Sequence, residues 1–161
     1  MTERWLEDYV PGAVHELGTI AVNLDEVLEF ARRFDPQPIH TDPEFAAQGP
    51  FGGLIASGWH TGSLMMRLVA LHYLSPASSL SSPGLDEVRW LRPVRPGDTL
   101  TVRVHIEEAR VSTSKPDRGV VRSLIETLDQ RGERVMTMRA VNMIARRPAG
   151  GVRPTAPASD Q

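Results

Sequence analysis

The stretch of this chain that is most constrained by its own chemistry is FARRFDPQPIHTDP, residues 30–43. Two prolines fix the backbone and remove two amide donors, so the segment from Asp35 to His40 is predicted to be non-helical. The residue before a proline is pushed towards extended conformations, which places Asp35 outside the preceding helix. A carboxylate and an imidazole on a stiff segment suit acid–base chemistry on one shared water. The spacing alone favours a simpler interpretation, in which Asp35 ends a helix and His40 lies on the surface.

The residues on either side of this stretch predict short, well-capped elements. Residues 13–21 could form a first strand, and Asn23 followed by Glu26 has the pattern of a helix capping box. Asp42 before Pro43 is typical of the start of a second, short helix. The first helix carries its apolar residues at helical spacing and stops before Pro36. These apolar residues are Leu24, Val27, Leu28, Ala31 and Phe34.

A second stretch, FGGLIASG at residues 51–58, leads into a long apolar segment that runs to Leu74. This segment is apolar nearly all round, which predicts a helix buried at the centre of the protein, roughly 25 Å long. The free amide groups at its start attract negative charge, and Gly58 has no side chain to block an approaching ligand. The alternative is that Ser57 only caps the helix and Gly58 is a packing residue.

The hydrophobic period changes after a Ser/Pro-rich turn at residues 75–84. Four segments then read as strands, because apolar and polar residues alternate along them and turn signals separate them. Helices followed by an antiparallel meander predict an α+β fold in which a buried helix packs on a sheet. The predicted strands are Val88 to Leu91, Thr99 to Glu107, Val120 to Asp129 and Arg134 to Ile144.

The bulk composition limits the classes of function. The 161 residues suit one domain, expected at 1–147, followed by a disordered Pro/Ala/Gly/Ser-rich tail at 148–161. Eighteen basic and 20 acidic residues argue against a nucleic-acid or membrane-surface protein. The chain has no cysteine, which excludes disulfides, thiolate chemistry and Cys-ligated metals, and no His/Asp/Glu cluster indicates another metal. The acidic N-terminus shows no secretory signal, so a cytoplasmic location is expected.

Residues 30–43 and 51–58 together resemble the signature of the MaoC-like dehydratases, a family that includes the (R)-specific enoyl-CoA hydratases. The later RPVRPGD, residues 92–98, resembles the strand and turn that follow in that family. The resemblance implies a hot-dog fold, in which a curved antiparallel sheet wraps a long central helix, usually assembled as a dimer. It also implies that Asp35 and His40 are the catalytic pair and that the backbone of Gly58 binds the thioester carbonyl.

The chain departs from the family pattern at two positions. Members often have asparagine two residues after the aspartate, where this chain has Gln37, and some have a serine where this chain has Met66. Ser63, one turn earlier on the helix, could partly replace that serine. These departures concern the identity of the substrate and leave the pair of Asp35 and His40 intact.

The function expected from the resemblance is reversible hydration of a 2-enoyl-CoA to a 3-hydroxyacyl-CoA, without a cofactor beyond the CoA of the substrate. The expected partners are acyl-CoA and a second copy of the chain in a homodimer. A hot-dog acyl-CoA thioesterase and a non-catalytic acyl-thioester-binding subunit are the alternatives. The expected substrate-binding residues are Gly58, Ser57, Ile55, Ala56 and Ser63.

The sequence offers two alternative roles for each of two further groups of residues. Arg89, Arg92 and Arg95 could meet the phosphates of CoA or form a solvated strand edge, and the sequence favours neither. Trp59 and Trp90 could shape an acyl pocket, but a place in the core is the preferred prediction for each.

Overall fold

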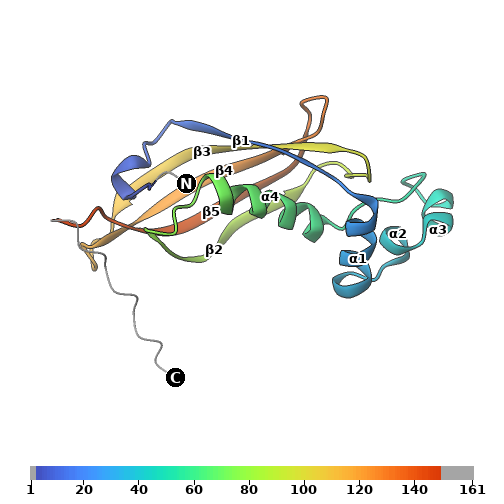
Figure 1. Ribbon diagram of the computed structural model, residues 1–161, viewed down its shortest axis with the longest axis horizontal. Coiled ribbons are helices and arrows are strands. Elements are labelled where there is room, and N and C mark those ends of the chain that lie inside the picture. Colours follow the sequence, from blue (N-terminus) through green and yellow to red (C-terminus); the bar gives the residue numbers. More distant parts are fainter. Residues whose placement is uncertain (1–2, 150–161) are drawn as a thin grey trace, which may run out of the picture.

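A computed structural model describes residues 3–149 of the chain, so most of the predicted tail at 148–161 lies outside the described residues. Its main feature is a five-stranded antiparallel sheet, with the helix α4 along one face (Figure 1). The strand order is β1-β3-β4-β5-β2, which leaves β1 and β2 at the edges. The predicted α+β architecture is therefore confirmed. The strands are β1 Val14–Ala21, β2 Ser79–Trp90, β3 Thr99–Val111, β4 Arg118–Leu128 and β5 Arg134–Ala145.

The core lies between the sheet and α4, which spans Gly58–His72. Alternate residues of β3 and β4 point to this face, as the period of two predicts. They meet the buried side of α4, including Leu68 and Val69. The buried strand residues of this core are Leu17, Val102, Val104, Ile106, Val121, Ile125, Met136, Ala140 and Ile144.

The prediction that α4 is buried all round is wrong for the single chain. The sheet covers one side of the helix only. Trp59 and Met66 on the other side, and Leu71 near the end of the helix, are exposed. The helix is apolar on both sides, but one sheet can cover only one of them. The uncovered side is an apolar surface that a second chain could bury.

Three short helices lie beyond one end of the sheet (Figure 1): α1 Leu24–Phe34, α2 Pro38–Thr41 and α3 Pro43–Gln48. The predicted caps at Asn23 and Asp42 are present, but the reciprocal bond from the Asn23 amide to the Glu26 side chain, which would complete the predicted capping box, is not formed. The Asn23 side chain accepts hydrogen bonds from the amides of Asp25 and Glu26. The Asp42 side chain accepts from the amides of Glu44 and Phe45, both at 3.0 Å. We call residues 24–54, which include these helices, the overhang.

The prediction that residues 35–40 contain no helix is wrong in part, because α2 forms one helical turn from Pro38. Proline is tolerated at the first position of a helix, where the amide that it lacks would have no intrahelical acceptor. The amide of Asp42 closes the turn on the carbonyl of Pro38 at 2.9 Å. Asp35 itself lies just outside α1, as Pro36 predicts, with φ −150°.

The strand β2 is longer than predicted, because residues 79–84 of the expected turn pair with β5. The pairing register shifts at several points along this strand. An edge strand pairs on one side only, so it tolerates Pro83 and such irregularities better than a central strand does.

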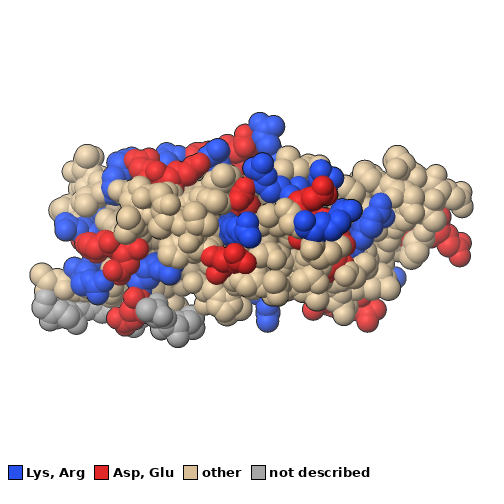
Figure 2. Space-filling view, turned by 90° about the horizontal axis from the view of Figure 1, so that it is seen from above, with Lys and Arg blue, Asp and Glu red and all other residues tan. Residues whose placement is uncertain are grey.

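The described residues carry balanced charge on the face seen in Figure 2, where basic and acidic side chains lie next to one another. Several are ion-paired, such as Arg103 with Glu16 and Arg92 with Glu133. Within residues 3–149, no helix is long and apolar enough to cross a membrane.

Candidate active site

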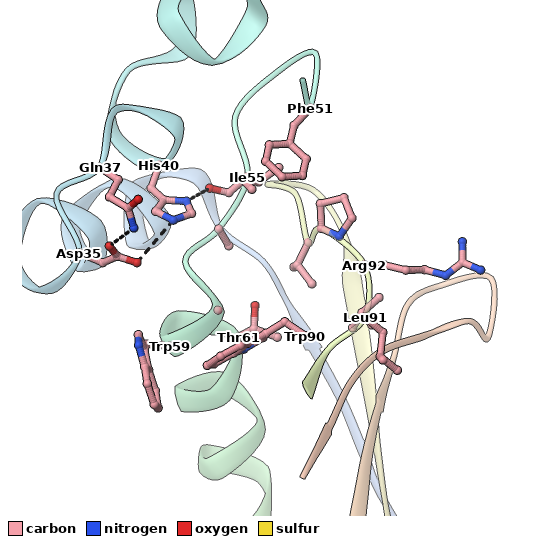
Figure 3. A pocket seen from close by; sticks show the side chains of 15 residues that line it. Asp35, Gln37, His40, Phe51, Ile55, Trp59, Thr61, Trp90, Leu91 and Arg92 are labelled. Carbon is pink, nitrogen blue, oxygen red and sulfur yellow. Dashed lines mark hydrogen bonds and ion pairs between the residues drawn. The ribbon is translucent and has the colours of Figure 1, made fainter. Parts of the chain in front are cut away.

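The overhang, the start of α4 and the end of β2 enclose a cavity of about 400 Å³. Figure 3 shows Asp35, Gln37 and His40 on one side of it and Leu91 and Arg92 on the other. The cavity therefore brings together segments that are far apart in the sequence. Its polar groups are concentrated on the side of the overhang.

Asp35, at the end of α1, and His40, in α2, have their side chains next to each other. The Nε2 atom of His40 lies 3.4 Å from Oδ2 of Asp35, and both residues line the cavity. The side chain of Asp35 is 18% exposed and that of His40 is 7% exposed. The pair is thus largely removed from bulk water, and the surface position considered for His40 is wrong.

The tautomer of His40 follows from its second hydrogen bond. Nδ1 lies 2.9 Å from the carbonyl oxygen of Ile55. A carbonyl oxygen only accepts, so Nδ1 carries a proton. In the neutral ring Nε2 then holds the lone pair, and this atom faces Asp35 and the cavity. His40 is therefore arranged to accept a proton at Nε2 and to return it.

Asp35 is held as an anion by two side-chain donors. Ser57 Oγ donates to Oδ2 at 2.6 Å, and Gln37 Nε2 donates to Oδ1 at 2.7 Å. These two hydrogen bonds, with the nearby His40 imidazole, hold the pKa of Asp35 below its ordinary value of 3.8, although partial burial opposes them. Gln37, the first departure from the family pattern, thus contacts the carboxylate directly.

The structure divides the five predicted substrate-binding residues into three groups. Ile55, Ala56 and Gly58 line the cavity with Asp35 and His40. Ser57 is fully buried, and its hydroxyl binds Asp35 while it accepts a bond from the amide of Trp59 at 3.2 Å. Ser63 bonds the carbonyl of Trp59 within α4 and lines a different cavity, with His60.

Trp90 and Gly58 make a contact that the sequence did not reveal. A Cβ atom on Gly58 would lie 2.5 Å from Nε1 and from Cε2 of the Trp90 ring, so only glycine permits this packing. The rings of Trp59 and Trp90 meet edge to face, with centroids 5.2 Å apart. Both rings are exposed and line the cavity, so the prediction that they belong to the core is wrong.

The three arginines considered for phosphate binding each have a different partner. Arg89 pairs with Glu87 at 2.9 Å and Arg92 with Glu133 at 3.0 Å. Arg95 donates to the carbonyl of Phe51, which joins the overhang to the strand side of the cavity. Of the three, Arg92 lines the cavity.

Other titratable residues give no sign of a metal site. Within residues 3–149 no group of three or more histidine and acidic side chains could hold a metal ion. His60 is buried against Phe30, with ring centroids 5.0 Å apart, and burial lowers its pKa. The cavity lining includes one carboxylate, of Asp35, and one imidazole, of His40, and these two groups can carry acid–base chemistry.

Comparison with known proteins is consistent with this site. Residues 10–127 match the family model described as MaoC like domain. The crystal structure of the MaoC-like dehydratase from Rhodospirillum rubrum is 39% identical and superposes with a TM-score of 0.84, over 91% of this chain and 100% of that one. The unliganded R-hydratase PhaJ1 from Pseudomonas aeruginosa, at 22% identity and a TM-score of 0.70 over 94% of this chain and 95% of that one, shares the fold. The predicted hot-dog fold is thereby confirmed.

A curated relative is also similar in sequence. The 3-hydroxyacyl-thioester dehydratase Z of Mycobacterium tuberculosis is 36% identical over 110 residues, which cover 67% of this chain and 70% of that protein. The matched family region contains the overhang, α4 and strands β1 to β3. Asp35, His40 and Gly58 therefore all lie inside it.

Proposed function

Because the chain belongs to the MaoC-like domain family, we propose that it is a hydro-lyase that reversibly adds water to a 2-enoyl-CoA thioester. The observation that carries this proposal is the pair of Asp35 and His40. One group is held as an anion, the other has its lone pair at Nε2, and the two face one cavity 3.4 Å apart. The product would be a 3-hydroxyacyl-CoA, and the reverse reaction is dehydration.

The start of α4 supplies the site for the thioester carbonyl. Gly58 is the first residue of the helix, where the amide has no intrahelical acceptor. This amide and the positive end of the helix dipole stabilise the negative charge that develops on the carbonyl oxygen. The carbonyl withdraws electrons from C3 and makes that carbon open to attack by water.

In the proposed step, a water molecule held between Asp35 and His40 attacks C3. Its proton passes to Nε2 of His40, and the electrons of the C2=C3 bond move onto the thioester oxygen. The imidazolium then donates the same proton to C2 as the enolate collapses, so one water is added in total. Asp35 remains ionised throughout, orients the water and stabilises the imidazolium. No cofactor is needed beyond the CoA of the substrate.

We expect the active form to be a homodimer. The uncovered side of α4 exposes Trp59, Met66 and Leu71, and the edge strand β2 leaves main-chain groups unpaired on one side. A second copy would bury the apolar side chains and pair the strand edge. Trp59 belongs both to this surface and to the cavity, so we expect the acyl site to lie close to the dimer interface.

The test is an absorbance assay with crotonyl-CoA. Loss of the enoyl chromophore without release of free thiol supports hydration, whereas release of thiol indicates a thioesterase instead. Asp35→Asn and His40→Ala should each lower kcat roughly a hundred-fold or more. The double variant should be little worse than the poorer single one, because both groups hold the same water.

The matched control is Asp42→Asn, the same chemical change seven residues away. Asp42 accepts two backbone hydrogen bonds at the start of α3, and asparagine caps helices about as well. This variant should keep its activity. If Asp35→Asn turns over normally while Asp42→Asn is inactive, the assignment of the pair is wrong. If the wild-type chain binds acyl-CoA but neither hydrates nor hydrolyses it, it is a binding subunit.

A further inference from the structure

The last residue of β2, Trp90, is held firmly beside the first residue of α4. Its backbone pairs with Met136 of β5, and the next amide, of Leu91, donates to the carbonyl of Val135 at 2.8 Å. One side of its ring lies against Gly58, so closely that a Cβ there would be 2.5 Å from Nε1. The ring of Trp59 supports it from another direction. The indole nitrogen therefore has a fixed place next to Gly58.

The indole N–H is a donor that the fold leaves available. An indole nitrogen can only donate a hydrogen bond. The side-chain hydrogen bonds formed within residues 3–149 include none from Trp90, which is 46% exposed and lines the cavity with Asp35 and His40. Tryptophan N–H groups usually find an acceptor when they are buried, and a substrate bound in the cavity would cover this ring. An acceptor supplied by the substrate is the natural partner for this one.

We propose that Nε1–H of Trp90 is a second hydrogen-bond donor to the thioester carbonyl oxygen, alongside the amide of Gly58. This inference rests on the proposed hydratase function and adds a catalytic residue to it. Figure 3 shows the Trp90 ring at the start of α4, below the side chains of Asp35 and His40. Two donors fixed before the reaction stabilise the developing enolate oxygen better than one, because neither has to reorganise.

The position of the ring also explains why Gly58 is a glycine. The first residue of α4 must present its amide to a ligand and must also allow the indole nitrogen to lie beside it. A methyl group at this position would overlap the ring and push its nitrogen away. Gly58 and Trp90 therefore act as one unit although 32 residues separate them in the sequence.

The test uses Trp90→Phe, which keeps an aromatic wall and removes the N–H. Butyryl-CoA, which is saturated and cannot be hydrated, is bound with a ¹³C label at its carbonyl, and the carbonyl stretch is measured by infrared difference spectroscopy. In the wild-type protein the stretch should move to lower frequency than in water. In Trp90→Phe part of this shift should be lost, and kcat with crotonyl-CoA should fall about a hundred-fold while KM changes less.

The control is Trp59→Phe, the same chemical change on the neighbouring ring. Trp59 also lines the cavity. If Trp90 is the donor, the carbonyl stretch in Trp59→Phe should keep its wild-type frequency. A second measurement needs no variant of Trp90. The chain has three tryptophans, and among their indole N–H resonances that of Trp90 should move downfield when butyryl-CoA binds.

A wild-type carbonyl frequency in Trp90→Phe, or an indole resonance of Trp90 that does not move, would overturn the inference. The ring would then be only a wall of the cavity, and the proposed function would stand as long as Asp35→Asn remains inactive. If the wild-type chain hydrates no enoyl thioester, the proposed function fails first and the role of Trp90 fails with it.

Discussion

Ser57→Ala should be more damaging than its small change in volume suggests. The hydroxyl is fully buried and takes part in two hydrogen bonds. It donates to Oδ2 of Asp35 at 2.6 Å, and it accepts from the amide of Trp59 at 3.2 Å. The first bond orients the Asp35 carboxylate, and the second caps α4. Alanine removes both and leaves a partly buried carboxylate oxygen without this donor.

The size of the effect follows from these two bonds. Loss of a serine cap costs about 1 kcal/mol, and loss of a hydrogen bond to a charged group costs about 1.5–3 kcal/mol. Both hydrogen bonds involve the Oγ atom of Ser57. We therefore expect Ser57→Ala to decrease the free energy of unfolding by about 3 kcal/mol. For a chain of this length that is a fall of roughly 10 °C in Tm. The pKa of Asp35 should rise, because the Ser57 bond is the largest cause of its depression.

Three measurements check this prediction: thermal denaturation, the carboxyl pKa of Asp35 by ¹³C NMR, and kcat with crotonyl-CoA. The control is Ser63→Ala on the same helix, whose hydroxyl bonds only the carbonyl of Trp59 in the preceding turn. Its Tm should change little. An unchanged pKa of Asp35 and a full kcat in Ser57→Ala would show that this hydroxyl does not hold the Asp35 carboxylate.

Three further predictions test other parts of the structure. The pKa of Asp35 in the folded state lies below its ordinary value of 3.8, so the folded state favours the ionised carboxylate. The ionised carboxylate therefore adds to the free energy of unfolding above about pH 4, and this contribution is lost as the pH falls through the folded pKa. Urea unfolding should therefore show the stability gap between wild type and Asp35→Asn narrowing below pH 4, and a constant gap would contradict this. Gly58→Ala should displace the Trp90 ring and lower kcat at least ten-fold, since its Cβ would lie 2.5 Å from that ring; normal kinetics would mean that the ring moves freely. Leu71→Glu should convert the expected homodimer into monomers in sedimentation experiments at micromolar concentration, and a wild-type monomer would remove the basis for this.

The sequence was sufficient where the decisive forces are local. Pro36 and Pro38 act on their own neighbours, so the place of Asp35 outside α1 followed directly from them. The caps at Asn23 and Asp42 also depend on amides two or three residues away. The same local reasoning missed the turn of α2, because the rule that proline breaks helices does not hold at the first helical position.

Features that depend on distant contacts did not follow from the sequence. Ser57 and Asp35 are 22 residues apart, and no pattern in the chain indicates that their side chains meet. The packing of Trp90 on Gly58 depends on how β2 ends against α4. The sequence predicted a ligand-binding amide at Gly58 and preferred a core position for Trp90, but it did not indicate that the two residues meet. The exposed side of α4 could not be predicted without knowing where the sheet packs. Hydrophobic periodicity does not tell whether the same chain or a second one covers an apolar face.

The overhang that carries Asp35 and His40 projects beyond the sheet (Figure 1). Several of its hydrogen bonds to the rest of the chain are made with residues 55–57, just before α4. Ile55 donates its amide to the carbonyl of Ile39 at 3.3 Å and accepts from the His40 ring at 2.9 Å. Release of these bonds would open the site and leave the strand ladders intact. Heat inactivation and melting of the sheet are then separate events. Amide hydrogens of the overhang should exchange with solvent faster than those of β3 and β4, and catalysis should fail while the circular dichroism of the sheet is still unchanged.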